Sequence, residues 1–97
     1  MTRDDAIAAL KALEPEARAL GVTGLYLFGS TARGEAGPDS DVDVFFDYDT
    51  TRVRGFAVFD IADFIASHLP RRGDAMARRN LHPRIVDDVM RDAVRVF

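Results

Sequence analysis

The sequence predicts a mixed α/β (α+β) domain, in which a small mixed three-stranded sheet is flanked by helices in the order αβαβαβα. Short apolar runs typical of strands occur at 24–28 and 41–46, and longer segments with helical apolar spacing precede and follow them. Glycine and proline residues punctuate these segments. A chain of 97 residues is near the usual size of one domain, so we expect a single domain over 1–97.

The first helical segment begins near Thr2, whose spacing from Asp5 is typical of a capping box. Its apolar stripe consists of Ile7, Leu10 and Leu13. Pro15 cannot lie in a helix interior without cost, so we expect the helix to kink or restart there. Gly21 is the expected C-cap of this region.

Strand one is predicted at 24–28, a short helix opens at Ser30, and turn-forming residues predict a loop at 34–39. Strand two is predicted at 41–46. A longer helix is predicted at 56–69. Its Phe56, Phe59 and Phe64 recur at helical spacing, so we expect them in the core. If some of these rings were exposed, they would suggest a partner surface instead.

Pro70 to Gly73 should break the long helix, and a weaker third strand is predicted at 74–78. Pro83 is a favourable first helical residue, so it should start the last helix. The apolar residues of that helix are Ile85, Val86, Val89, Met90, Ala93 and Val94.

Composition narrows the class of protein. The chain has no cysteine, which excludes disulfides and thiolate metal sites, and no apolar run is long enough to span a bilayer. The acidic start is unlike a signal peptide, so we expect a cytoplasmic protein. The net charge of −3 argues against a general nucleic-acid binder, although residues 71–97 carry 7 arginines and 4 aspartates.

One segment carries a chemical pattern. Gly29 and Ser30 close the first apolar run, where a small residue, free amides and a hydroxyl can hold phosphate oxygens. Asp41 and Asp43 begin the second run at alternate positions, so their side chains should project from the same face of the strand. Two adjacent carboxylates repel each other, and a divalent cation such as magnesium resolves that conflict.

Strand directions bring a third carboxylate to the same place. Antiparallel pairing of strands one and two puts Gly29 beside Asp41, whereas parallel pairing would separate them by about the 17 Å length of a strand. A parallel crossover from strand two to strand three then puts Asp74 at that edge. The competing acids are Asp47 and Asp49 beyond the far end of strand two, and Asp60 and Asp63 on the long helix.

Gly29-Ser30, Arg33-Gly34 and Ser40-Asp41-Val42-Asp43 resemble the signature of the nucleotidyltransferases of the DNA polymerase beta superfamily. The sequence is most similar to the minimal nucleotidyltransferase (MNT) group, whose bacterial members are antitoxins paired with HEPN-domain toxins. The similarity covers nearly the whole chain. It implies the polymerase beta palm-like fold and the transfer of AMP from ATP to a hydroxyl, with a tyrosine of a cognate HEPN toxin as the acceptor.

The resemblance also implies residue roles. Asp41, Asp43 and Asp74 would bind two magnesium ions, and Asp74 would accept the proton of the nucleophile. Gly29, Ser30 and Arg33 would contact the nucleotide. In the family the strand around the third acid is usually branched and hydrophobic, whereas Gly73, Ala75 and Met76 surround Asp74 here.

Several alternatives remain open from sequence. Arg33 can instead pair with Glu35 or Asp39, and Ser40 can shape the turn. His68 and His82 have no second histidine at ligand spacing. The whole chain can be a small-molecule nucleotidyltransferase of the aminoglycoside-modifying kind, or an antitoxin that acts by binding alone. The leading interpretation is a hetero-oligomer with the toxin, without direct contact to nucleic acid or membrane.

Overall fold

The computed structural model describes residues 2–35, 42–69 and 73–97. Asp41, Ser40 and the predicted break at 70–72 lie outside these residues. The elements follow in the order α1 (Arg3–Lys11), α2 (Glu14–Leu20), β1 (Val22–Phe28), α3 (Gly29–Ala32), β2 (Val42–Tyr48), α4 (Ala57–Ser67), β3 (Gly73–Ala77), the 3-10 helix η1 (Arg78–Asn80), α5 (Val86–Asp92) and β4 (Val94–Arg95).

The sheet has the strand order β3-β2-β1-β4. As predicted, β1 and β2 are antiparallel, and β2 and β3 are parallel. The α/β prediction is confirmed, but the sheet has four strands and not three. The extra strand, β4, pairs with β1 through Tyr26 opposite Arg95 and Leu27 opposite Val94.

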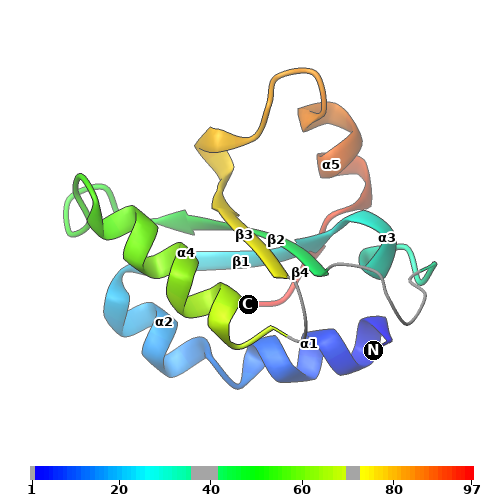
Figure 1. Ribbon diagram of the computed structural model, residues 1–97, viewed down its shortest axis with the longest axis horizontal. Coiled ribbons are helices and arrows are strands. Elements are labelled where there is room, and N and C mark those ends of the chain that lie inside the picture. Colours follow the sequence, from blue (N-terminus) through cyan, green and yellow to red (C-terminus); the bar gives the residue numbers. More distant parts are fainter. Residues whose placement is uncertain (1, 36–41, 70–72) are drawn as a thin grey trace.

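Two layers of helices cover the sheet (Figure 1), with α1, α2 and α4 on one side and α5 on the other. Neighbouring residues of β2 point to opposite layers, so Phe45 and Phe46 are both fully buried. Val42, Val44 and Phe46 pack toward α1, α2 and α4, whereas Phe45 packs with Phe28, Leu81 and Val89 on the α5 side. Asp43 shares the face of Phe45.

The N-terminal signals act as predicted. Thr2 and Asp5 form a capping box, in which the amide of Asp5 donates to Thr2 Oγ1 over 3.1 Å and the amide of Thr2 donates to Asp5 Oδ2 over 3.2 Å. Pro15 lies in the first turn of α2, so the helix restarts. Gly21 ends α2 with φ +108°, and a Cβ there would collide with Val53.

The long helix α4 differs from the prediction on its first turn. Phe56 is its N-cap and is 84% exposed, and Phe59 is 59% exposed, so placing these two rings in the core was wrong. Ile61 and Ile65 provide the buried stripe instead, and Phe64 packs partly against it. The helical spacing of the phenylalanines identified the helix but not which side of it is buried.

The unusual composition of β3, which is rich in small residues, is explained by the close packing against this strand. α4 packs against β3, and Ala75 and Ala77 join the core that contains Ile61 and Ile65. A Cβ on Gly73 would lie 2.4 Å from the Cβ of Leu69. Branched side chains would therefore push the helix away from the strand, and the weak strand signal is a consequence of this close approach.

The C-terminal region departs most from the prediction. α5 begins at Val86 and not at Pro83, because the preceding turn is closed by the amide of Arg84, which donates to His82 Nδ1 over 3.1 Å. Ala93 is extended, with ψ 134°, so Val94 belongs to β4 and not to the helix. None of the helices in the described segments is long and apolar enough to cross a membrane.

Candidate active site

Two of the predicted metal-binding carboxylates lie next to each other. Asp43 on β2 is directly opposite Asp74 on β3 in the parallel register, and both belong to the face of the sheet that carries Phe45 and Met76. Asp74 is exposed and Asp43 is partly buried. The strand directions inferred from sequence put Asp74 at the edge of the sheet where β2 begins, and the register of β2 and β3 sets it opposite Asp43.

Gly29 lies beside Asp43 on the β1 side of β2, opposite to the side on which β3 lies. Phe28 is opposite Asp43 in the antiparallel register, so the turn that follows β1 begins at the same edge. Gly29 has φ +77°, and a Cβ built on it would lie 2.8 Å from Asp43 Oδ2. Glycine is thus required by both backbone conformation and the proximity of the carboxylate.

The short helix α3 (Gly29–Ala32) carries the rest of the motif that the sequence predicts to bind phosphate. Ser30 is partly buried, and its carbonyl accepts the amide of Glu35 over 2.9 Å. Thr31 and Ala32 are buried and anchor the helix to the body of the protein. The backbone of α3 is therefore held at the edge of the sheet where Asp43 and Asp74 lie.

Arg33 is the C-cap of α3 and contacts two carboxylates. Its Nε donates to Glu35 Oε2 and its Nη1 donates to Asp92 Oδ2, each over 3.0 Å. The hydrogen bond to Glu35, followed by that to Asp92, raises the pKa of Arg33 further above its usual value. The salt bridge to Glu35 that the sequence allowed is present, whereas Asp92 was missed because no spacing rule connects residues 59 apart.

The donor set fits magnesium as far as the structure describes it. Asp43 and Asp74 are paired oxygen donors, which is the ligand type that Mg²⁺ prefers, and Gly29 leaves space beside one of them. Among the described residues, no group of three acidic, histidine or cysteine side chains could hold an ion. Asp41, the third predicted ligand, lies outside those residues.

The competing acids occupy other places. Asp47 is bound in a fork by Arg78, with Nε–Oδ1 at 2.8 Å and Nη2–Oδ2 at 2.9 Å. Asp49 accepts two hydrogen bonds from Thr51. Asp60 and Asp63 are exposed on α4, in the helical layer on the opposite face from Asp43.

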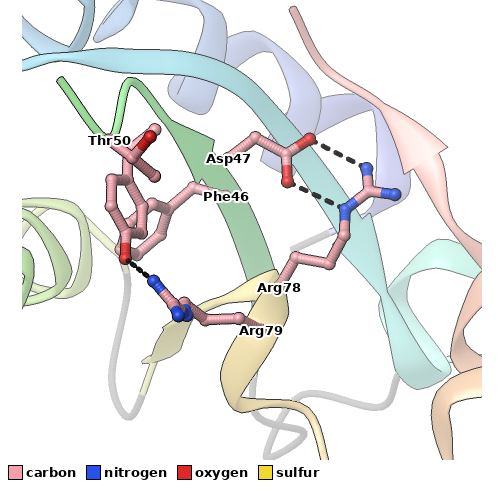
Figure 2. A pocket seen from close by; sticks show the side chains of 6 residues that line it. Phe46, Asp47, Thr50, Arg78 and Arg79 are labelled. Atoms are coloured by element: carbon pink, nitrogen blue, oxygen red, sulfur yellow. Dashed lines mark hydrogen bonds and ion pairs between the residues drawn. The ribbon is translucent and has the colours of Figure 1, made fainter.

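A pocket of about 440 Å³ lies at the other end of β2. Phe46, Asp47, Tyr48, Thr50, Arg78 and Arg79 line it. Figure 2 shows Arg78 turned toward Asp47 and Arg79 turned away from it. Nη1 of Arg79 donates a hydrogen bond to the hydroxyl oxygen of Tyr48 over 2.9 Å. Because Asp43 and Asp47 are about 13 Å apart along the strand, this pocket is separate from the carboxylate pair.

Comparison with known proteins identifies the family of the chain. The family model of the nucleotidyltransferase domain matches residues 7–96. The chain belongs to this family. The nucleotidyltransferase predicted from the motif is therefore confirmed, and the edge of the sheet with Gly29, Asp43 and Asp74 is its candidate active site. A comparison with curated proteins gave no significant match.

Solved structures share the fold. A candidate minimal nucleotidyltransferase is 29% identical with a TM-score of 0.74, and the match covers 97% of this chain and 95% of that one. A toxin–antitoxin complex with AMP-PNP is 22% identical with a TM-score of 0.65, over 100% and 73% of the two chains. A tri-AMPylated HEPN toxin of Shewanella oneidensis with its MNT antitoxin gives 19% identity and a TM-score of 0.61, over 94% and 71%.

These similarities confirm the predicted resemblance to minimal nucleotidyltransferases. The two toxin–antitoxin structures are less than 25% identical to this chain, so they support the fold alone.

Proposed function

We propose that this nucleotidyltransferase transfers AMP from ATP to a hydroxyl of a partner protein, a tyrosine of a cognate HEPN toxin, and thereby acts as its antitoxin. The observation that carries the proposal is the pairing of Asp43 with Asp74 beside Gly29. Further support comes from structural neighbours described as an AMPylated HEPN toxin with an MNT antitoxin and a toxin–antitoxin with AMP-PNP.

In this proposal Asp41, Asp43 and Asp74 hold two magnesium ions. When bound, magnesium neutralises triphosphate charge and lowers the pKa of a hydroxyl that coordinates it. The amide of Gly29 and the hydroxyl of Ser30 hold the β- and γ-phosphates. Gly29 is suited to this role because a glycine allows the backbone to approach a phosphate closely.

The reaction exchanges one phosphorus–oxygen bond for another. The acceptor oxygen attacks the α-phosphorus of ATP, and the bond from that phosphorus to the β-phosphate bridging oxygen breaks as pyrophosphate leaves. The proton of the acceptor hydroxyl passes to the carboxylate of Asp74. The exposure of Asp74 makes it accessible to a hydroxyl that is presented by another molecule.

A macromolecular acceptor agrees with the shape of the described surface. The pocket of about 440 Å³ is at the opposite end of β2, so it does not provide an acceptor pocket beside Asp43. A partner protein could present a hydroxyl directly to the exposed Asp74. The exposed rings of Phe56 and Phe59 on α4 offer apolar contact area of the kind that is enriched at interfaces.

The test is incubation of the purified protein with labelled ATP, magnesium and the product of the adjacent gene, followed by mass spectrometry. We expect AMP on a partner tyrosine, and its loss in the Asp43→Asn variant. In a parallel incubation that also contains an aminoglycoside, label on that compound with the partner unmodified would favour a small-molecule nucleotidyltransferase. Neutralisation of the toxin by the Asp43→Asn variant, without label, would favour an antitoxin that acts by binding.

A further inference from the structure

The contact between Arg33 and Asp92 joins two parts of the chain that are 59 residues apart. Arg33 ends α3, the helix that begins with Gly29 and Ser30. Asp92 is the last residue of α5, which packs on the same face of the sheet as Asp43. The ion pair therefore connects the phosphate-binding turn to the helix that covers the carboxylate-bearing face.

The two side chains of this pair are less exposed than those of the neighbouring ion pair on α5. The side chain of Asp92 is 29% exposed and that of Arg33 is 42% exposed, and their atoms are 3.0 Å apart. On the same helix, Asp88 and Arg91 are 70% and 72% exposed and 3.2 Å apart. Partial burial reduces solvent screening, so the Arg33–Asp92 contact should contribute more than the Asp88–Arg91 pair.

The short helix needs such an anchor. A helix of one turn has too few internal hydrogen bonds to be stable by itself, so its position depends on tertiary contacts. The amides of Arg33, Gly34 and Glu35 close the turn by donating to the carbonyls of Gly29, Thr31 and Ser30. Displacement of the Arg33 side chain would loosen these bonds.

We propose that Asp92 is a positioning residue of the transfer site, which acts through Arg33 to hold α3 and its Gly29-Ser30 turn in place. This inference rests on the proposed function for its catalytic consequence. It differs from a direct role of Arg33 in binding the triphosphate, because in that case Asp92 would compete with the nucleotide for the guanidinium.

The test compares Asp92→Asn with Asp88→Asn, a matched control on the same helix. In the free protein, Asp92→Asn should speed amide hydrogen exchange at Arg33, Gly34 and Glu35 by about two- to fivefold, as expected for loss of a largely exposed ion pair. Binding of Mg·AMP-PNP and kcat/KM for ATP should fall by about the same factor. The Asp88→Asn variant should change none of these quantities.

A double-mutant cycle tests whether Asp92 acts through Arg33. The Arg33→Ala/Asp92→Asn protein should be no more impaired than Arg33→Ala, since each of the two changes removes the same Arg33–Asp92 contact. Tighter nucleotide binding by Asp92→Asn, additive losses in the cycle, or unchanged amide exchange would each overturn the proposal. If the unmodified protein transfers no AMP but the exchange and binding effects are present, the proposed function fails while the positioning contact stands.

Discussion

Asp43 and Asp74 lie directly opposite each other on the neighbouring parallel strands β2 and β3. Two carboxylates at adjacent positions on one face of a sheet repel each other without a cation. The same juxtaposition makes them suitable ligands for magnesium. The same arrangement of two carboxylates is therefore electrostatically unfavourable without a cation and suited to the chemistry of the family.

Neutralising either carboxylate should remove activity and preserve the fold. We expect Asp43→Asn and Asp74→Asn to reduce transfer at least about a hundredfold, because each removes a metal ligand. Without metal, Asp74→Asn should melt at the same or a higher temperature, since repulsion is relieved. The control is Asp60→Asn on α4, and a comparable loss of transfer in that variant would contradict the assignment of Asp74.

Gly29→Ala should impair both the backbone and the site. The positive φ of Gly29 is unfavourable for alanine by about 1–2 kcal/mol. The added Cβ would also displace the Asp43 carboxylate. The control is Gly55→Ala, which has φ +61° but nothing within 4 Å of the new Cβ. Chemical unfolding should show similar losses of stability, whereas transfer should fall only in Gly29→Ala.

Gly73→Ala tests the close approach of β3 to Leu69, which follows α4. Its Cβ would overlap the side chain of Leu69, so we expect a loss of about 1–3 kcal/mol in the free energy of unfolding. Leu69→Ala should also destabilise the protein by removing a buried side chain. Leu69→Ala removes the Leu69 Cγ and Cδ1 atoms that the new Cβ would meet but keeps the Leu69 Cβ, so the double variant should recover only part of the summed losses. Strict additivity would show that the two residues do not compete for space.

The phenylalanines of the chain should separate into two classes. Phe56→Ser should change the free energy of unfolding by no more than about 0.5 kcal/mol, because the ring is 84% exposed. Phe45→Ala should cost about 3–5 kcal/mol, because the ring is fully buried between Tyr26 and Phe28. Urea unfolding of both variants checks this prediction, which a large loss in Phe56→Ser would contradict.

The hydrogen bonds that Asp49 accepts should give the protein a stabilisation that is lost in acid. The Thr51 hydroxyl, followed by the Thr51 amide, lowers the pKa of Asp49 below 3.8. Because the folded pKa is below the unfolded one, this contribution is complete above about pH 3.8 and is lost as the pH falls through the folded pKa. Thr51→Val should raise the pKa toward 3.8 in an NMR titration. Thr50→Val should not.

Local and alternating patterns were sufficient to predict much of the molecule. The capping box, the restart at Pro15, the strand directions and the position of Asp74 at the start of β3 all follow from short-range chemistry and strand geometry. The fourth strand, formed by Val94 and Arg95, could not be found this way, because Val94 continues the apolar spacing of the helix before it. Their conformation is decided by pairing with β1, which lies far away in sequence.

The same limit applies to the site. The sequence suggested Glu35 as a partner of Arg33 because the two are close along the chain. Asp92 reaches Arg33 only after α5 has packed across the sheet, so its contact depends on the tertiary structure. Likewise, helical spacing revealed the amphipathic α4 but did not determine that Ile61 and Ile65, and not Phe56, would meet the core.

The alternation of β2 has a consequence for the kinds of sequence change the strand can accept. A substitution at one position affects one layer of the protein, but an inserted or deleted residue within 42–46 would exchange both faces at once. The carboxylate of Asp43 would then lie in the packed layer between the sheet and helices α1, α2 and α4. A valine would take its place opposite Asp74. Length variation in this strand should therefore be far less tolerated than replacement of its side chains.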